Sequence, residues 1–514
     1  MENNLQRNRI LRPMEDFLDV QPDKSLLLLN ITLALIYFIV VVFLFPAGNR
    51  VLFWLLIGGE IFHLWQICTF LYTIWDVKVS IPQNSAYMPE VDIFITVAGE
   101  PRDVVEQTLK AVLAMKYPKF YVYLLNDGFV TKKENWQEVE VLAKQYKVNA
   151  ITRTIPGGAK AGNINNGLTH SQSEFVVVFD ADHVPHSDFL TKMIPYFSDP
   201  KVAFVQSPQF YKNSALNFVT SGSWEQQELF FGAICKGKNR LNSATMCGTN
   251  MAVRRSSLLD VGGMCEESIA EDFVTGLFMH QKGLTSVYVG EVLAEGLAPE
   301  DFLSYYKQQF RWARGALDVL FKYKLLTMKG LTWQQKIQYL ASASFYVSGI
   351  IVALNAFIPL VFFFTGQVPF HISTMVLASA FLPYIFVTIY TLARTTNYTY
   401  TFQSLAFSMS SFSIHLQALW STISGEKPKF DITSKKKIEG NFIYLVRPHL
   451  IYIFLVIVGI ATAVLREGFS PSVAANSAWG IFYIIIFCDF ILASLPERKT
   501  SSKKAAIIPK VVYN

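Results

Sequence analysis

The fold is decided by the stretch FVVVFDADHVP at residues 175–185. Five apolar residues rich in β-branched valine, without a helical period, predict a buried parallel strand. Asp180 and Asp182 stand at its carboxyl end, on the same side because strand side chains alternate. Open α/β sheets bind ligands at this end of their strands, and two carboxylates suit a hard cation such as Mg²⁺ or Mn²⁺. The alternative is a plain turn after the strand.

The composition predicts an integral membrane protein with a soluble part. The chain has 514 residues, and 52% of them are hydrophobic, which is too apolar for an ordinary soluble protein. A formal net charge of +6 gives no reason to expect a nucleic-acid partner. The five cysteines are scattered without a C-x-x-C pair, which fits reduced thiols better than disulfides or a zinc site. No signal peptide opens the chain, so the first apolar run is expected to remain as an anchor.

Six apolar segments have the length of a membrane-spanning helix. They are residues 26–45, 51–74, 339–364, 372–391, 443–464 and 477–495. The segment 402–423 is also long enough, but its serines and helical period predict an interfacial helix. Basic residues on both sides of it belong in the cytoplasm, which forbids a single crossing. We therefore expect six spans, with both termini in the cytoplasm.

The second span contains two polar side chains that are costly in lipid. Glu60 and His63 lie one turn apart, so they are expected to face a protein interior or a polar path. A hydrogen bond between helices accounts for them equally well.

Strand and helix signals alternate between the second and third spans, which predicts a soluble α/β domain. Strands are expected at 91–97, 122–125, 149–152 and 202–206, and helices at 103–115, 133–145 and 273–282. Asp127 follows the second of these strands and so lies, like Asp180, at a carboxyl end. Lys160 belongs to the turn-rich stretch PGGAKAGNINNG at 156–167, where it can reach a phosphate near a helix N-terminus. This stretch matches neither the P-loop nor the Rossmann fingerprint.

Two further positions in this domain can carry chemistry. The segment MCGTN at 246–250 is small and polar, which suits a close approach of backbone to a ligand. Glu271 and Asp272 begin the predicted 273–282 helix. Carboxylates there either complement the helix dipole or face a cleft.

A helix predicted at 299–324 follows, with Pro299 in its first turn. Gln308, Arg311 and Trp312 fall on one of its faces by their i, i+3 and i+4 spacing. A solvated basic face is the alternative for Arg311 and Arg314, although it does not account for Trp312.

The ordered set of Asp127, the D-x-D pair, Glu271-Asp272 and Q-x-x-R-W resembles the processive family 2 glycosyltransferases, specifically the cellulose synthase family. The resemblance runs from about 94 to 312 and, more weakly, to 436. Supporting segments are AKAGNINNGL from 159, VQSPQFY from 205, GLAPE from 296 and QQFRW from 308. The resemblance implies a GT-A-like α/β catalytic domain inserted into an α-helical membrane domain.

Site roles are implied by the same resemblance. Residues implied to contact the donor nucleotide are Asp127, Lys160, Asp180 and Arg311. Residues implied to contact the acceptor are Gln308, Trp312, Cys247 and Gly248. Asp182, together with Asp180, is implied to hold Mg²⁺ or Mn²⁺, and Asp272, beside Glu271, to be the general base. Phe430, Thr433 and Lys435 resemble the family's gating loop F-x-V-T-x-K, for which a basic membrane-proximal loop is the alternative.

The predicted function is a processive, inverting synthase that makes a β-glucan from UDP-glucose and extrudes it across the plasma membrane. Where the family usually has Thr-Glu-Asp, this chain has Ala270, so a hydroxyl is missing. Six spans are closer to hyaluronan synthases, but those have Gly-Asp-Asp here and lack the F-x-V-T-x-K loop. A capsule-type glucan stays possible. The cytosolic C-terminal domain of bacterial cellulose synthase is absent, so regulation by cyclic di-GMP is not expected.

The expected organisation follows the spans and motifs. It comprises a cytosolic segment 1–24, two spans in 25–75, a catalytic domain 88–298, interface helices 299–335, two spans in 336–395, an interfacial helix and gating loop 400–440, two spans in 441–496 and a basic tail 497–514. Three alternatives stay open: a hyaluronan- or N-acetylglucosamine-type synthase, a non-processive transferase to a lipid carrier, and a transporter using Glu60, His63 and Asp489. The sequence does not determine linkage, chain length or oligomeric state.

Overall fold

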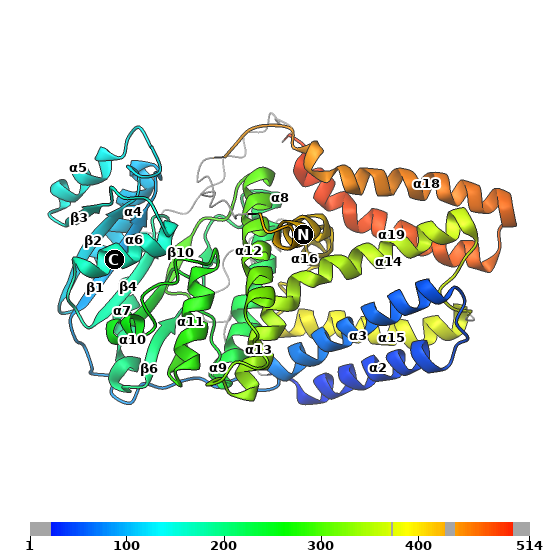
Figure 1. The fold of residues 1–514 in the computed structure, drawn as a ribbon, viewed down its shortest axis with the longest axis horizontal. Coiled ribbons are helices and arrows are strands. Elements are labelled where there is room, and N and C mark those ends of the chain that lie inside the picture. Colours follow the sequence, from blue (N-terminus) through cyan, green and yellow to red (C-terminus); the bar gives the residue numbers. More distant parts are fainter. Residues whose placement is uncertain (1–21, 372–373, 427–436, 497–514) are drawn as a thin grey trace, which may run out of the picture.

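The structure is a computed structural model that describes residues 22–371, 374–426 and 437–496. An α/β region lies at one end and a bundle of long apolar helices at the other, with α8, α12 and α13 between them (Figure 1). Within the described residues, six helices are long and apolar enough to cross a membrane, as predicted. The surface of the helix bundle is therefore suited to a lipid bilayer, and that of the α/β region to water.

The α/β region is built on a seven-stranded sheet with the order β3-β2-β1-β4-β8-β6-β9. The strands are β1 Val91–Val97, β2 Phe120–Asn126, β3 Asn149–Thr152, β4 Phe175–Asp180, β6 Val202–Gln206, β8 Met251–Arg254 and β9 Thr285–Tyr288. β4 runs parallel to β1 but antiparallel to β8. The strand predicted to be parallel is therefore parallel on one side only. The sequence prediction missed its antiparallel neighbour, β8. A three-stranded sheet, β5 Val184–Pro185, β10 Ala294–Gly296 and β7 Phe210–Tyr211, follows the end of β4.

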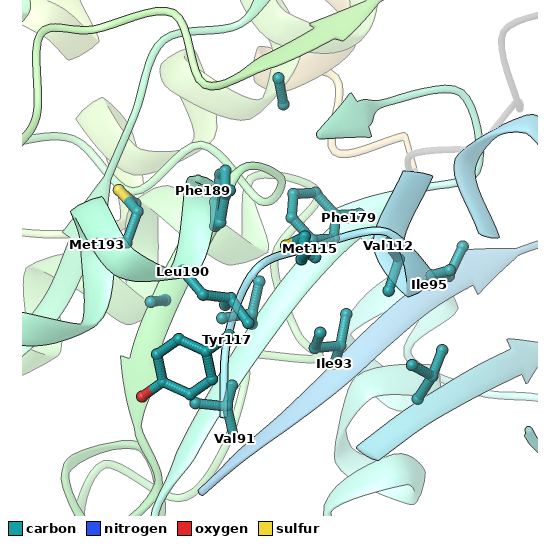
Figure 2. Close-up of a cluster of buried hydrophobic side chains, with 14 of the residues drawn as sticks. Val91, Ile93, Ile95, Val112, Met115, Tyr117, Phe179, Phe189, Leu190 and Met193 are labelled. Carbon is teal, nitrogen blue, oxygen red and sulfur yellow. The ribbon is translucent and has the colours of Figure 1, made fainter. Parts of the chain in front are cut away.

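The central strands β1, β4, β6 and β8 are buried on both faces, which accounts for their mostly apolar sequences. Alternate residues of β1 point to opposite sides, so Ile93 and Ile95 enter one core and Phe94 the other. Figure 2 shows the first core, where Ile93 and Phe179 pack with side chains of the flanking helices. The flanking helices are α4 Arg102–Leu113, α5 Gln137–Tyr146, α6 Ala159–Thr169, α7 Phe189–Met193, α10 Arg255–Asp260 and α11 Glu271–Gln281. This packing holds the carboxyl ends of β1, β2 and β4 together at one edge.

Helices connect the sheet to the bundle. They are α8 Phe218–Glu228, a π-helical turn Leu229–Ile234, α9 Cys235–Arg240, α12 Phe302–Lys322 and α13 Trp333–Ser344. The α12 helix begins later than predicted, because the Oδ1 of Asp301 caps it by accepting from the backbone N–H of Ser304 at 2.8 Å. Pro299 therefore lies before the helix and not in its first turn.

The apolar helices are α2 Lys24–Phe43, α3 Arg50–Thr73, α14 Ser348–Thr365, α15 Thr374–Thr395, α18 Arg447–Glu467 and α19 Pro471–Ser494. Helix α13 continues through a short 3-10 turn into α14 as one apolar unit, Trp333–Thr365. The predicted interfacial helix is two helices, α16 Phe402–Ser410 and α17 Phe412–Ile423. Glu60 contacts α2, because the Tyr37 hydroxyl donates to it at 3.1 Å, whereas the His63 ring lies beside Tyr384 of α15. The contact between Tyr37 and Glu60 is the helix–helix hydrogen bond that the sequence left open.

Candidate active site

The end of strand β4 gathers three groups that can bind a metal ion. Ligand atoms of Asp180, Asp182 and His183 lie within 4.8 Å of one another. His183 is 4% exposed, and neither of its ring nitrogens has a hydrogen-bond partner among the described residues, although Nδ1 lies 3.5 Å from Asp182 Oδ1. Two carboxylates and an imidazole without a hydrogen-bond partner fit a divalent cation. The sequence prediction missed His183, whose position directly after D-x-D was the available signal.

The His183 ring is fixed by the backbone of β10. A Cβ atom on Gly296 would lie 2.6 Å from His183 Nε2, so only glycine allows the ring this position. The backbone N–H of Leu297 also donates to Asp182 Oδ2 at 3.2 Å. The GLAPE segment therefore holds His183 and Asp182 in place, although it lies more than a hundred residues further along the chain.

Asp127 lies at the end of β2, as predicted, but its carboxylate is held in a buried ion pair. Arg153 donates to it from Nε at 2.8 Å and from Nη2 at 2.6 Å. The same guanidinium bonds the backbone carbonyls of Gly157 and Ala159, so the pair fixes the turn that precedes α6. This turn is shorter than predicted, since α6 already begins at Ala159. The sequence prediction missed Arg153.

Lys160 lies in the first turn of α6 and forms an ion pair with Asp180. Burial alone would lower the pKa of Lys160, but the carboxylates of Asp180 and Glu271 raise it above its ordinary value. Burial would raise the pKa of Asp180, yet Lys160 and His183 hold it below its usual value. Both groups are therefore charged near neutral pH, and Lys160 supplies a fixed positive charge between Asp180 and Glu271.

The 246–250 segment approaches Lys160 and Asp272 through its glycine. Gly248 has a φ of +73°, and a Cβ there would lie 2.8 Å from Asp272 Oδ2 and 3.4 Å from Lys160 Nζ. Gln206, at the end of β6, holds the segment by accepting from Cys247 N at 2.9 Å and donating to Thr249 O at 2.8 Å. The close approach of backbone to carboxylate agrees with the small residues of this segment. Gln206 was not singled out from the sequence.

Glu271, which is buried, and Asp272, which is half-buried, form an acidic pair at the start of α11. Burial raises the pKa of both carboxyl groups, and with the charge of Asp272 it brings the pKa of Glu271 to about 7. The backbone N–H of Phe273 donates to Asp272 Oδ1 at 2.7 Å and favours the ionised form of that residue. Burial therefore favours the neutral form of both carboxyl groups, and the N–H of Phe273 opposes this effect at Asp272.

Substituting Glu271 with Gln is expected to stabilise the protein more at pH 8 than at pH 5. A glutamate with a folded pKa of about 7 adds stability below its unfolded pKa and loses it as the pH rises through 7. The gain on substitution should therefore be about 2 kcal/mol larger at pH 8. Chemical denaturation in EDTA measures it, with the exposed Glu267→Gln as control. An equal gain at both pH values would contradict the raised pKa.

Helix α12 places its polar residues toward the same edge. Gln308 is 8% exposed and bonds the hydroxyl of Tyr211, while the charge of Arg311 acts on Tyr211 and Asp272. Trp312 is half-buried on the same helix. The solvated basic face is wrong for Arg314, which is 3% exposed and paired with Asp318 in the same helix.

The backbone of α12 at Gly315 packs against the two residues that precede α11. A Cβ on Gly315 would lie 2.9 Å from Ala270 Cβ and 3.3 Å from Ile269 Cγ2. The residue that replaces the family's threonine is therefore the one that faces α12. Phe430, Thr433 and Lys435, the predicted gating residues, lie outside the described residues.

Substituting Gly315 with Ala is expected to separate these two helices. Overpacking of this kind costs about 1–3 kcal/mol, and the shift would move Asp272 relative to Gln308 and Arg311. The midpoint temperature of thermal unfolding and the turnover rate should both fall. Gly58→Ala, where no atom lies within 4 Å of the added group, should change neither quantity. Unchanged turnover in Gly315→Ala would show that this contact does not set the geometry of the site.

Comparison with known protein families gives two overlapping matches. Residues 89–315 match the model of the glycosyltransferase like family 2, and residues 260–495 match the cellulose synthase model. Cellulose synthase 2 of Novacetimonas hansenii is 30% identical over 395 residues, which are 74% of this chain and 24% of that protein. The cellulose synthase catalytic subunit (UDP-forming) of Pseudomonas fluorescens (strain SBW25) is 28% identical over 456 residues, 84% of this chain and 61% of that protein. The chain thus spans between 24% and 61% of the length of these two relatives.

A solved structure confirms the predicted GT-A-like fold. The mannosyltransferase from Pyrobaculum calidifontis in complex with GDP-Man and Mn²⁺ superposes with a TM-score of 0.50 and 16% sequence identity. The match covers 72% of this chain and 99% of that chain. At this identity the likeness concerns the fold alone.

Proposed function

This chain belongs to the family 2 glycosyltransferases with a cellulose synthase domain, and we propose that it polymerises a β-glucan from UDP-glucose. The observation that carries the proposal is the convergence on one edge of Asp180, Lys160, Gly248 and Asp272. Lys160 pairs with Asp180 of the candidate metal site and lies beside Gly248, whose backbone approaches the Asp272 carboxylate. The residues proposed to bind the donor nucleotide, called the donor half, therefore lie next to those proposed to bind the acceptor, called the acceptor half.

The donor half holds the nucleotide. Asp180, Asp182 and His183 offer the ligand atoms for Mg²⁺ or Mn²⁺. A cation bound there would stabilise the charge that develops on the leaving diphosphate. Lys160 and Arg311 add fixed positive charge at the same edge. Asp127 acts here through Arg153, which fixes the turn in front of Lys160. Its direct contact with the nucleotide is part of the proposal.

The acceptor half activates the end of the growing chain. Asp272 takes the proton of the acceptor hydroxyl, whose oxygen bonds C1 of the sugar as the bond from C1 to the diphosphate oxygen breaks. A single displacement at an α-linked donor gives a β-linkage and releases UDP. The indole of Trp312 is suited to pack on the apolar face of the terminal sugar. Gln308, Cys247 and Gly248 are assigned to the acceptor.

The membrane region receives the product in this proposal. In the described part of the chain, six helices of sufficient length and apolarity precede or follow the catalytic region, and in this proposal the polymer leaves the site directly toward the bilayer. The catalytic region and both termini are assigned to the cytoplasmic side of the plasma membrane, with the domain boundaries predicted from the sequence. The predicted gating residues keep their assignment as a proposal.

The test is synthesis by the purified protein with Mg²⁺ or Mn²⁺ and one donor at a time. UDP-glucose, UDP-N-acetylglucosamine and UDP-glucuronate are supplied separately, and any polymer is digested with linkage-specific hydrolases. We expect a polymer from UDP-glucose that a β-glucanase degrades. Polymer from another donor only would reject the glucan, and short lipid-linked products would reject processive synthesis. Solute flux without turnover of any nucleotide sugar would favour a transporter.

A further inference from the structure

Helix α9 buries a lysine that is held by hydroxyl groups. Lys238 is 2% exposed, and its Nζ donates to Thr245 Oγ1 at 2.9 Å and to Ser342 Oγ at 2.6 Å. Among the described residues, Lys238 forms no salt bridge, and its hydrogen bonds go to these two hydroxyl groups. Burying an amine without a counter-ion costs more than burying an apolar side chain of the same length. The two hydrogen bonds are what this position gains from a lysine.

One of these bonds reaches the loop beside the acidic pair. Thr245 lies directly before the segment of the acceptor half, and its carbonyl accepts from Cys247 Sγ at 3.4 Å. Gly248 then contacts the Asp272 carboxylate. Gln206 holds the other side of the same segment through the backbone N–H of Cys247. The loop is therefore fixed from two directions, and Lys238 provides the one that does not come from the sheet.

The other bond reaches a helix that joins the membrane region. Ser342 belongs to α13, which continues into the apolar helix α14. One turn earlier, Gln338 Nε2 donates to Thr73 Oγ1 of α3 at 2.8 Å. The hydroxyl of Tyr339 lies 2.6 Å from Nδ1 of His280, near the end of the helix that Asp272 begins. Helix α13 is thus bonded to α11 directly and to the loop through Lys238, which are two of the elements that place the acceptor half.

We propose that Lys238 is a positioning residue that fixes the Thr245–Gly248 loop against α13, so that the acceptor half is placed by the membrane-linked helix α13. The inference rests on the proposed function. The donor half has further supports, since Arg153 is held by the 157–159 turn and His183 by Gly296, although the backbone N–H of Asp180 also donates to Thr249 of the 246–250 segment. Loss of Lys238 therefore lowers turnover more than donor binding.

The test compares Lys238→Met with the matched control Lys192→Met, a lysine paired with surface carboxylates. Lys238→Met should lower kcat about tenfold, as expected for loss of two buried hydrogen bonds, and leave KM for UDP-glucose within about twofold. Alkylation of Cys247 by N-ethylmaleimide, followed by peptide mass spectrometry, should become about tenfold faster relative to Cys265. Lys192→Met should match the wild type in all three measurements.

Each outcome has one meaning. Unchanged kcat and unchanged Cys247 alkylation in Lys238→Met overturn the positioning role, and so does a change confined to KM. If Lys238→Met does not fold, Ser342→Ala removes only the bond to α13 and should show the same pattern at about threefold. Its absence would overturn the inference. A wild type that turns over no nucleotide sugar rejects the proposed function, whereas the alkylation comparison still decides whether Lys238 fixes the loop.

Discussion

Substituting Asp272 with Asn is expected to abolish polymer synthesis, with a loss of about 10²- to 10⁴-fold in turnover. The amide keeps the size of the side chain and can still accept from Phe273 N–H, so the local fold should remain. It cannot take up the proton of the acceptor hydroxyl. Radiolabelled polymer formed from UDP-glucose per unit time measures the effect.

The control for this prediction is Asp103→Asn. Asp103 is also in the first turn of a helix, α4, but is exposed. UDP binding by Asp272→Asn, measured by calorimetry, should stay close to the wild-type value, because the donor half is untouched. Turnover like that of the wild type would contradict the assignment of Asp272 as general base. Glu271 would then be the residue to test, since its raised pKa also suits a proton acceptor.

Removing the divalent cation, or its central ligand, should have an effect of similar size. In EDTA we expect no polymer, and synthesis should return when Mn²⁺ or Mg²⁺ is added in excess. Asp182→Asn should lose about 10²- to 10⁴-fold in turnover, because the charge on the leaving diphosphate would go unstabilised. Asp182 is buried, and its Oδ2 accepts from Leu297 N–H, so the amide can still occupy the position.

A direct measurement of Mn²⁺ binding distinguishes loss of the metal from other causes of lost activity. Mn²⁺ affinity in the presence of UDP, followed by electron paramagnetic resonance, should fall in Asp182→Asn. Asp188→Asn, a half-exposed carboxylate six residues later, should leave it unchanged. Metal-stimulated synthesis of wild-type size by Asp182→Asn would show that the cation is bound elsewhere.

The sequence by itself determined the strands β1 to β4 and β6, the spans and the main acids. β1, β3 and β6 have the predicted bounds, and β1 and β6 are buried runs of mostly apolar residues, which accounts for their clear signal. The six apolar helices follow from length and hydropathy alone. Asp127 and Asp180 could be placed at one edge, since parallel strands present their carboxyl ends together.

Only the tertiary structure decided which groups support these acids. Arg153, His183 and Lys238 act through contacts with residues that lie far away along the chain or whose side-chain direction no local pattern gives. The pairing of β4 with β8 likewise depends on a strand too short to stand out by periodicity. The raised pKa of Glu271 and the closeness of Gly248 to Asp272 require burial and backbone approach. Sequence patterns report local periodicity and residue chemistry, whereas burial and contacts between distant segments arise only when the chain packs.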